Sequence, residues 1–283
     1  MTKLPVAAGL ALALVAGSAL AADLPSHKAP PAYIPPPPTF TWTGLYGGVN
    51  IGYSFNAGGA GWGYFADPLL LSGATWTANP SAQGVIGGGQ IGYNYQYSPW
   101  LVIGAEADIQ AADINSQQNN WMPSNWFGGL AALNTNKYVD WFGTVRGRLG
   151  LVMPSYPNLM VYGTAGFAYG YVSNTVSVAN YPFAAFPVPF AQTGQTTSGN
   201  TNTGWTAGGG VEWTPMAFPA WSLKVEYLYT DLGVTNQSFF SVFTNTATNF
   251  TAANQSPTRF HTVRAGLNWH FNPFASAPVL AKY

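Results

Sequence analysis

Charge is the scarcest feature of this sequence. Lys, Arg, Asp and Glu make up only 6% of the 283 residues, whereas a soluble domain carries about 25% charged residues. The nine basic and nine acidic residues cancel, which gives a formal net charge of zero. A chain with this balance offers no basic surface, and we expect no nucleic-acid partner.

Cysteine and long hydrophobic runs are missing as well. The lack of cysteine excludes a disulfide framework and the attachment of a lipid to a thiol. After the N-terminus no apolar run approaches the roughly 20 residues that a membrane-spanning helix needs. The composition is nevertheless 47% hydrophobic and 16% aromatic. Contact with lipid must therefore come from the other structure that can span a bilayer, a β-barrel.

The N-terminal residues 1–21 have the pattern of a secretory signal peptide. Lys3 precedes an apolar stretch over 6–15, and the sequence ALA at 19–21 places small residues at the −3 and −1 positions of a cleavage site. These features predict export and a mature chain that begins at Ala22. A retained membrane anchor is the alternative, and it is disfavoured because the segment is short and carries a cleavage site.

Residues 22–40 are predicted to form a proline-rich periplasmic linker. Four consecutive prolines at 35–38 favour an extended polyproline II conformation. Such a segment serves as a solvated spacer, or it touches peptidoglycan or a periplasmic protein, although no recognition motif supports the second use. At the other end of the chain, residues 272–283 are predicted to form a C-terminal tail.

From Thr41 onward the sequence alternates between apolar and polar residues and breaks at regular places, as barrel strands do. Eight candidate strands cover residues 41–55, 83–96, 100–113, 137–152, 159–174, 204–215, 221–233 and 258–271. Short connections near 97–99, 153–158 and 216–220 alternate strictly with long polar ones at 56–82, 114–136, 175–203 and 234–257.

This alternation predicts an all-β fold: an eight-stranded antiparallel up-and-down transmembrane β-barrel over residues 41–271. Three short periplasmic turns and four long extracellular loops would connect its strands, and both termini would lie in the periplasm. A soluble eight-stranded barrel is the alternative. It would not need an apolar exterior.

Nearly every charge inside a predicted strand lies opposite the apolar row. In 100–113, for example, Ile103 and Ile109 share one face while Glu106 and Asp108 share the other. Aromatic residues gather at the ends of the apolar row, as in the interfacial girdles of membrane barrels. We therefore predict that the apolar row faces lipid and that the other face forms a lumen polar network of Glu106, Asp108, Asp140, Arg146, Arg148, Glu212, Lys224, Glu226, Arg264 and His270.

Small residues share the polar face, since many glycines, such as Gly48, Gly88 and Gly166, fall on it. Eight strands enclose an interior that side chains can just fill, and nearly balanced charges in such a space should pair. The hypothesis is a lumen plugged by ion pairs. A porin-like channel that passes small solutes is the main alternative, and an ion or proton relay through the carboxylates is another.

Enzyme and metal chemistry find little support. The predicted barrel contains only His261 and His270, and no serine lies at His-x-Ser spacing, so we predict no catalytic residues. No His, Asp and Glu cluster has the spacing of metal ligands, and we expect no metal and no cofactor. The glycine-rich 84–92 lacks the helix that follows a nucleotide-binding loop.

Several motifs together resemble the outer-membrane immunogenic protein family of alphaproteobacteria, a set of small porin-like eight-stranded barrels. They are AADLP at the mature start, FTWTGLYGGVNIGYSF, VRGRLG, YGTAGFAYG, KVEYLYTDLG and HTVRAGLNWHF, which ends on Phe271 like a C-terminal assembly signal. The tail 272–283 departs from this pattern.

The resemblance implies location in the cell outer membrane. We expect an envelope-structural and surface-interaction role there. Outer-membrane lipid, lipopolysaccharide and, during insertion, the barrel-assembly machinery are the expected partners. Aromatic residues in the predicted loops, such as Trp121, Trp126 and Phe127, would contact a partner or lie among lipopolysaccharide chains.

Overall fold

The computed structural model describes residues 40–67, 72–78, 81–123, 130–181, 192–242 and 249–271. The predicted signal peptide, the predicted tail and all of the predicted linker except Phe40 lie outside these residues. Every regular element within them is a β-strand. In this part of the chain, no helix is long and apolar enough to cross a membrane.

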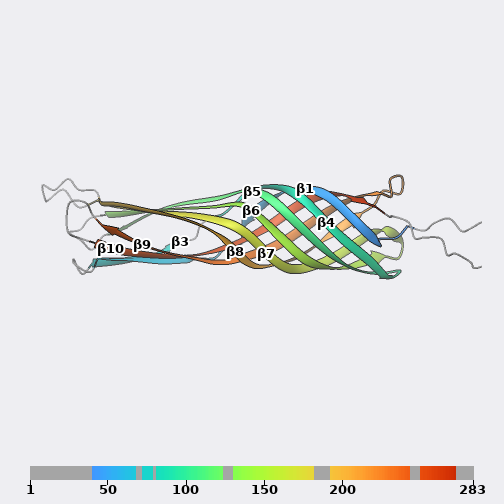
Figure 1. Ribbon diagram of the computed structural model, residues 1–283, viewed down its shortest axis with the longest axis horizontal. Helices are drawn as coiled ribbons and strands as arrows, with labels where there is room; N and C mark the ends of the chain where they lie inside the picture. Colours follow the sequence, from blue (N-terminus) through green and yellow to red (C-terminus); the bar gives the residue numbers. More distant parts are fainter. Residues whose placement is uncertain are drawn as a thin grey trace, which may run out of the picture. The chain divides into compact units, whose positions relative to one another are not determined.

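Ten strands form one antiparallel sheet (Figure 1). They are β1 (Gly44–Asn56), β2 (Gly61–Asp67), β3 (Ser72–Ala78), β4 (Gly84–Ser98), β5 (Leu101–Pro123), β6 (Leu130–Met153), β7 (Tyr156–Tyr181), β8 (Gln192–Trp213), β9 (Trp221–Val242) and β10 (Asn249–His270). The order of neighbours is β1-β4-β5-β6-β7-β8-β9-β10, and β1 also pairs with β10. Each of these eight strands therefore has two partners. The β2–β3 hairpin pairs through β2 with residues 251–255 of β10. These residues lie in the outer part of β10, where outer denotes the end of the sheet away from Gly44, the first residue of β1.

Two predictions about the connections were wrong. The predicted loop 56–82 contains β2 and β3, and much of the predicted loops 114–136, 175–203 and 234–257 continues the flanking strands. The apolar alternation stops there because the outward face becomes rich in Thr, Asn, Gln and Ser, but cross-strand pairing continues without it. The short connections lie where expected, for example at Pro99–Trp100 and Pro154–Ser155.

The two faces of the sheet have opposite chemistry, and the apolar one points outward. Ile109 in β5 is 56% exposed, whereas the adjacent Asp108 is 5% exposed. The same inversion runs along β9, where Leu223 and Val225 are exposed and Lys224 is buried. In the half that contains β1 and β4, the strands run side by side and inclined (Figure 1). The predicted assignment of the apolar row to the exterior agrees with these exposures.

The outer ends of the strands separate into two groups. β8 pairs with β9 only over Trp205–Trp213, and its outer part, Gln192–Gly204, pairs with β7. In β9, Gly233 has a φ of 76° just above the last β8–β9 pair, a conformation that glycine adopts without strain. Polar side chains bridge the groups: Asn202 Nδ2 donates to Thr235 Oγ1 (2.9 Å), and Gln237 Nε2 donates to the Asn174 carbonyl (2.8 Å).

Glycines recur on the buried face, most of all in β1, β4, β7 and β8. A Cβ atom would come within 3.0 Å of a neighbouring atom at each of Gly48, Gly52, Gly88, Gly92, Gly166, Gly170, Gly208 and Gly210. At Gly92 the neighbour is the phenol ring of the buried Tyr46. The interior is therefore filled to the point where these positions accept no side chain.

We expect Gly92→Val to lower the free energy of unfolding by about 1–3 kcal/mol, because the added methyl groups would displace Tyr46. Gly89→Val is the matched control, since Gly89 lies on the outward face of the same strand with only one backbone oxygen within 4 Å. Urea unfolding of both variants in lipid vesicles measures the difference. Equal stabilities would contradict the filled interior.

Candidate functional site

Eight ionisable side chains gather on the buried face at the centre of the sheet. They are Glu106 and Asp108 of β5, Arg146 and Arg148 of β6, Glu212 of β8, Lys224 and Glu226 of β9, and Arg264 of β10, each at most 5% exposed. Period-two alternation brings them to one face, because successive strand residues point to opposite sides. Four carboxylates thus meet four cations. We call this set the ion-pair network.

Glu106 is the centre of the ion-pair network. Its carboxylate oxygens lie 2.5 Å from Arg146 Nη2, 2.8 Å from Lys224 Nζ, 3.3 Å from Arg148 Nη1 and 3.5 Å from Arg264 Nη2. The hydroxyl of Tyr46 donates to the same carboxylate at 2.7 Å. One side chain of β5 therefore contacts charges from β6, β9 and β10.

Two arginines connect the remaining carboxylates near Glu106. Arg146 lies 2.8 Å from Asp108 and 2.9 Å from Glu226. Arg264 contacts the same pair, at 2.9 Å and 2.6 Å. Thr144 completes the cluster, since its hydroxyl donates to Asp108 at 2.8 Å. Each charge of the ion-pair network near Glu106 thus has partners of opposite sign, the condition under which burial is tolerated.

Glu212 holds the far end of the ion-pair network. It accepts from Arg148 Nη2 (2.7 Å), Asn268 Nδ2 (2.8 Å) and the hydroxyl of Ser222 (2.5 Å). His270 joins here, with Nε2 at 2.9 Å from Ser222 Oγ and 3.5 Å from Glu212 Oε1. The structure thus places nine of the ten residues predicted for the lumen on the buried face and brings them into contact.

A serine, a histidine and a carboxylate meet at this end, although no serine lies at His-x-Ser spacing from His261 or His270 in the sequence. β9 pairs with β10 so that Ser222 lies opposite Asn268, two residues from His270. The arrangement is not that of a hydrolase triad, because Ser222 and Glu212 approach the same imidazole nitrogen, whereas a triad uses both. In the described residues, no three His, Asp or Glu side chains are placed to hold a metal ion.

Asp140 does not belong to the ion-pair network, and its predicted position was wrong. The side chain is exposed. The pairing of β6 shifts register between Val139 and Trp141, so that Val139 and Phe142 both become buried and Asp140 turns outward. A β-bulge of this kind breaks the period of two on which the prediction relied.

An aromatic cluster that the sequence did not reveal lies below the ion-pair network, at the end where β1 begins. Trp42 is fully buried, and its indole Nε1 donates to the Pro157 carbonyl at 3.0 Å. It packs with Val102, Val152, Met160 and Tyr162. The sequence suggested that the strand begins at Thr41, but β1 begins at Gly44, where a φ of 146° redirects the chain.

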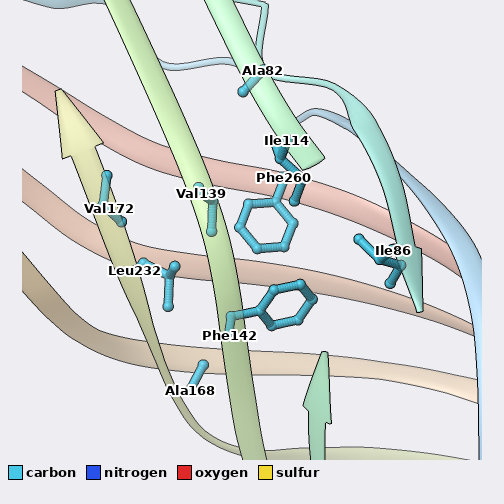
Figure 2. Packing of buried hydrophobic residues seen from close by; sticks show 9 residues of the cluster. All are labelled: Ala82, Ile86, Ile114, Val139, Phe142, Ala168, Val172, Leu232 and Phe260. Atoms are coloured by element: carbon cyan, nitrogen blue, oxygen red, sulfur yellow. The ribbon is translucent and has the colours of Figure 1, made fainter. Parts of the chain in front are cut away.

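A second apolar cluster lies on the opposite side of the ion-pair network. Figure 2 shows its nine side chains. The rings of Phe142 and Phe260 meet edge to face, with centroids 5.2 Å apart. Side chains of β4–β7 and β9 surround them: Ile86, Ile114, Val139, Ala168, Val172 and Leu232, with Ala82 just before β4. The buried face is thus apolar, charged and apolar in succession.

Lys137 lies beyond the second cluster, in the outer part of β6, where the outward face is polar. It is buried, and its ammonium donates to the Pro257 carbonyl (2.8 Å) and Thr258 Oγ1 (3.2 Å). No carboxylate among the described residues pairs with it. Burial lowers the pKa of Lys137 to about 7.

The fold and its buried charges define a class of protein, the outer-membrane β-barrel. A model of the outer membrane protein beta-barrel domain matches residues 8–271, and the chain belongs to this family. It is 37% identical over 264 residues to the 31 kDa outer-membrane immunogenic proteins of Brucella melitensis biotype 1 and Brucella suis biovar 1. Each match covers 92% of this chain and 96% of the relative. The protein is located in the outer membrane.

Two solved structures show a distant likeness. The outer membrane protein OprG of Pseudomonas aeruginosa is 10% identical, with a TM-score of 0.43 over 81% of this chain and 97% of that one. Neisserial surface protein A is 15% identical, with a TM-score of 0.31 over 81% of this chain and 98% of that one.

Glu106→Gln should lower the free energy of unfolding by about 3–5 kcal/mol, because it removes the shared partner of four buried cations. Asp140→Asn removes one negative charge from an exposed position, and we expect a change within about 0.5 kcal/mol. Chemical unfolding in lipid vesicles compares the two. An effect of equal size would show that Glu106 is not the centre of the network.

Lys137→Met should stabilise the protein most below pH 7. The native pKa of Lys137 lies below its unfolded value, so the wild-type chain becomes more stable as pH rises from about 7 towards 10.5. The advantage of the variant should therefore shrink over that range, by at most about 1.4 kcal/mol per pH unit. Unfolding of both proteins from pH 6 to pH 10 measures this, and a constant difference would contradict it.

Proposed function

We propose that β1 and β4–β10 form a closed eight-stranded transmembrane barrel with a plugged interior. Its role would be to support the envelope and to present a surface outside the cell. The observation that carries the proposal is that three filled layers follow one another on the buried face. They are the Trp42 cluster, the ion-pair network and the cluster around Phe142 and Phe260.

Pairing and exposure support closure within the membrane. β1 pairs over eleven positions with both β4 and β10, so none of the eight strands has a free edge in this region. A bilayer requires this, because an unpaired N–H or C=O group in hydrocarbon costs several kcal/mol. The outward face carries exposed apolar side chains such as Val49, Val145 and Leu267, which lipid would cover.

The connections support one orientation. The short connections lie at the end of the sheet where β1 begins and β10 ends, and exported barrels keep their short turns in the periplasm. The outer parts of β5–β10 and the β2–β3 hairpin would then lie outside the cell. The mature N-terminus and the proline-rich segment would remain in the periplasm, in reach of peptidoglycan or a periplasmic protein.

The exterior position of the strand ends supports a surface role. The relatives are named immunogenic outer-membrane proteins, in keeping with a surface that antibodies reach. We propose lipopolysaccharide and outer-membrane lipid as the surrounding partners and the barrel-assembly machinery as the partner during insertion. The Ser222, His270 and Glu212 group has the wrong geometry for hydrolysis, which supports a role without catalysis.

A plugged interior predicts no stepwise current. Refolded residues 22–283 in a planar bilayer should give no resolvable openings, since ions would have to displace Trp42, the paired charges and the Phe142–Phe260 contact in turn. Folding is verified by heat-modifiable migration in electrophoresis.

Two sets of variants test the layers separately. Phe142→Ala with Phe260→Ala removes only the apolar layer around these two rings. We expect this double variant to give no current, because the ion-pair network and the Trp42 cluster remain. Arg146→Ala and Arg148→Ala are the controls within that network. Reproducible wild-type openings whose conductance changes with these arginines would overturn the plugged barrel and favour a porin-like channel for small solutes.

A further inference from the structure

Arg259 differs from every other basic side chain in the described residues. Lys137, Arg146, Arg148, Lys224 and Arg264 are at most 4% exposed, whereas the side chain of Arg259 is 39% exposed. Arg259 lies on the outward face of β10, the face that carries the exposed Val263 and Leu267. Arg259 is thus a cation on the outward face, and the residues that follow it on this face of β10 towards His270 are largely apolar.

Arg259 lies near the end of the mainly apolar exterior, beyond which only scattered apolar side chains of the described residues, such as Val234 and Trp62, are exposed. Arg259 pairs with Asp231, and Asp231 pairs with Trp205 of β8. The rings of Trp205 and Tyr229 lie 5.2 Å apart and form part of an aromatic belt. In the proposed membrane placement, on which this inference rests, such a belt marks the headgroup level of the outer leaflet.

Only one nitrogen of the Arg259 guanidinium, Nε, has a hydrogen-bond partner among the described residues. Its Nε donates to Asp231 Oδ2 at 2.8 Å, and the other oxygen of Asp231 accepts from the backbone N–H of Gly233 at 2.8 Å. No described residue accepts a hydrogen bond from the two terminal nitrogens of Arg259. These nitrogens form the planar edge that binds a phosphate through two parallel hydrogen bonds.

His261 provides a second polar group beside Arg259. It is two residues further along β10 on the same face, and its Nδ1 lies 2.7 Å from the hydroxyl of Tyr227. The imidazole also contacts Phe55, with ring centroids 5.2 Å apart. These contacts fix the ring and leave Nε2 without a partner in the described part of the chain. Phe55 and Tyr227 are themselves exposed and offer apolar surface for an acyl chain.

We propose that Arg259 and His261 bind the phosphate group of a phosphorylated glycolipid in the outer leaflet. Asp231 positions the guanidinium, the terminal nitrogens of Arg259 bind the phosphate, and His261 adds a hydrogen bond. Phe55 and Tyr227 contact the lipid chain below. The site requires both parts of the ligand, since the polar and apolar groups lie side by side on β1, β9 and β10.

The test is native mass spectrometry of the folded protein with lipid A in phosphorylated and dephosphorylated forms. Wild-type protein should retain the phosphorylated form about tenfold better, the effect of one charge-assisted hydrogen-bonding group. Arg259→Gln should remove this preference, and His261→Gln should reduce it. Gln255→Ala, on the same face of β10, is the matched control and should leave it unchanged.

Asp231→Asn distinguishes phosphate binding by Arg259 from a purely structural ion pair between Arg259 and Asp231. If Arg259 binds phosphate, this variant keeps or strengthens the preference, because an amide oxygen can still accept from Nε and orient the guanidinium while the negative charge that repels phosphate is removed. An Arg259→Gln variant that retains the phosphorylated lipid like wild type would overturn the proposal. Displacement of the lipid by millimolar inorganic phosphate would overturn the lipid as the ligand and indicate a site for free phosphate.

The membrane placement is tested separately. Lipids with brominated acyl chains should quench the fluorescence of the exposed belt tryptophans in wild-type protein whatever happens at Arg259. Quenching without phosphate preference would reject the lipid site and leave the barrel placement standing, whereas an absence of quenching would reject the placement itself.

Discussion

The narrow interior is the constraint on which the rest of this structure depends. A long charged side chain fits there most readily where its neighbour on one adjacent strand is a glycine. The register shows this directly, since six network residues lie opposite glycine: Glu106 and Gly92, Arg146 and Gly166, Arg148 and Gly104, Lys224 and Gly266, Glu226 and Gly210, and Arg264 and Gly52. The glycines thus leave the space that the charged side chains on the neighbouring strands occupy.

The same constraint makes the ion-pair network dependent on the pairing of all eight strands, β1 and β4–β10. Lys224 and Arg264 reach Glu106 across 118 and 158 residues of sequence. Until β9 and β10 take their places, the carboxylates of β5 lack these partners and would be costly to bury. The charges therefore favour the fully paired arrangement over partly assembled ones, in addition to the backbone hydrogen bonds between β1 and β10.

Sequence patterns predict those features that follow a period of two without interruption. They identify the outward apolar row, the short connections and nine residues of the buried polar face, because alternation alone decides them. They miss Asp140 because a bulge beside Val139 shifts the register, and Trp42 because Gly44 redirects the chain. The outer strand ends were missed for another reason: with a polar outward face, pairing leaves no apolar alternation in the sequence.

In the proposed membrane placement, the separation of β8 from β9 lies at the level where the membrane would end. Hydrocarbon does not tolerate an unpaired strand edge, but water satisfies the exposed N–H and C=O groups. The last β8–β9 pair is Trp205 with Asp231, at the aromatic belt and one step from Arg259. Pairing between β8 and β9 thus ends at the level at which the outward face changes from mainly apolar to mainly polar. Two unrelated properties, backbone pairing and side-chain chemistry, therefore change at one level of the sheet.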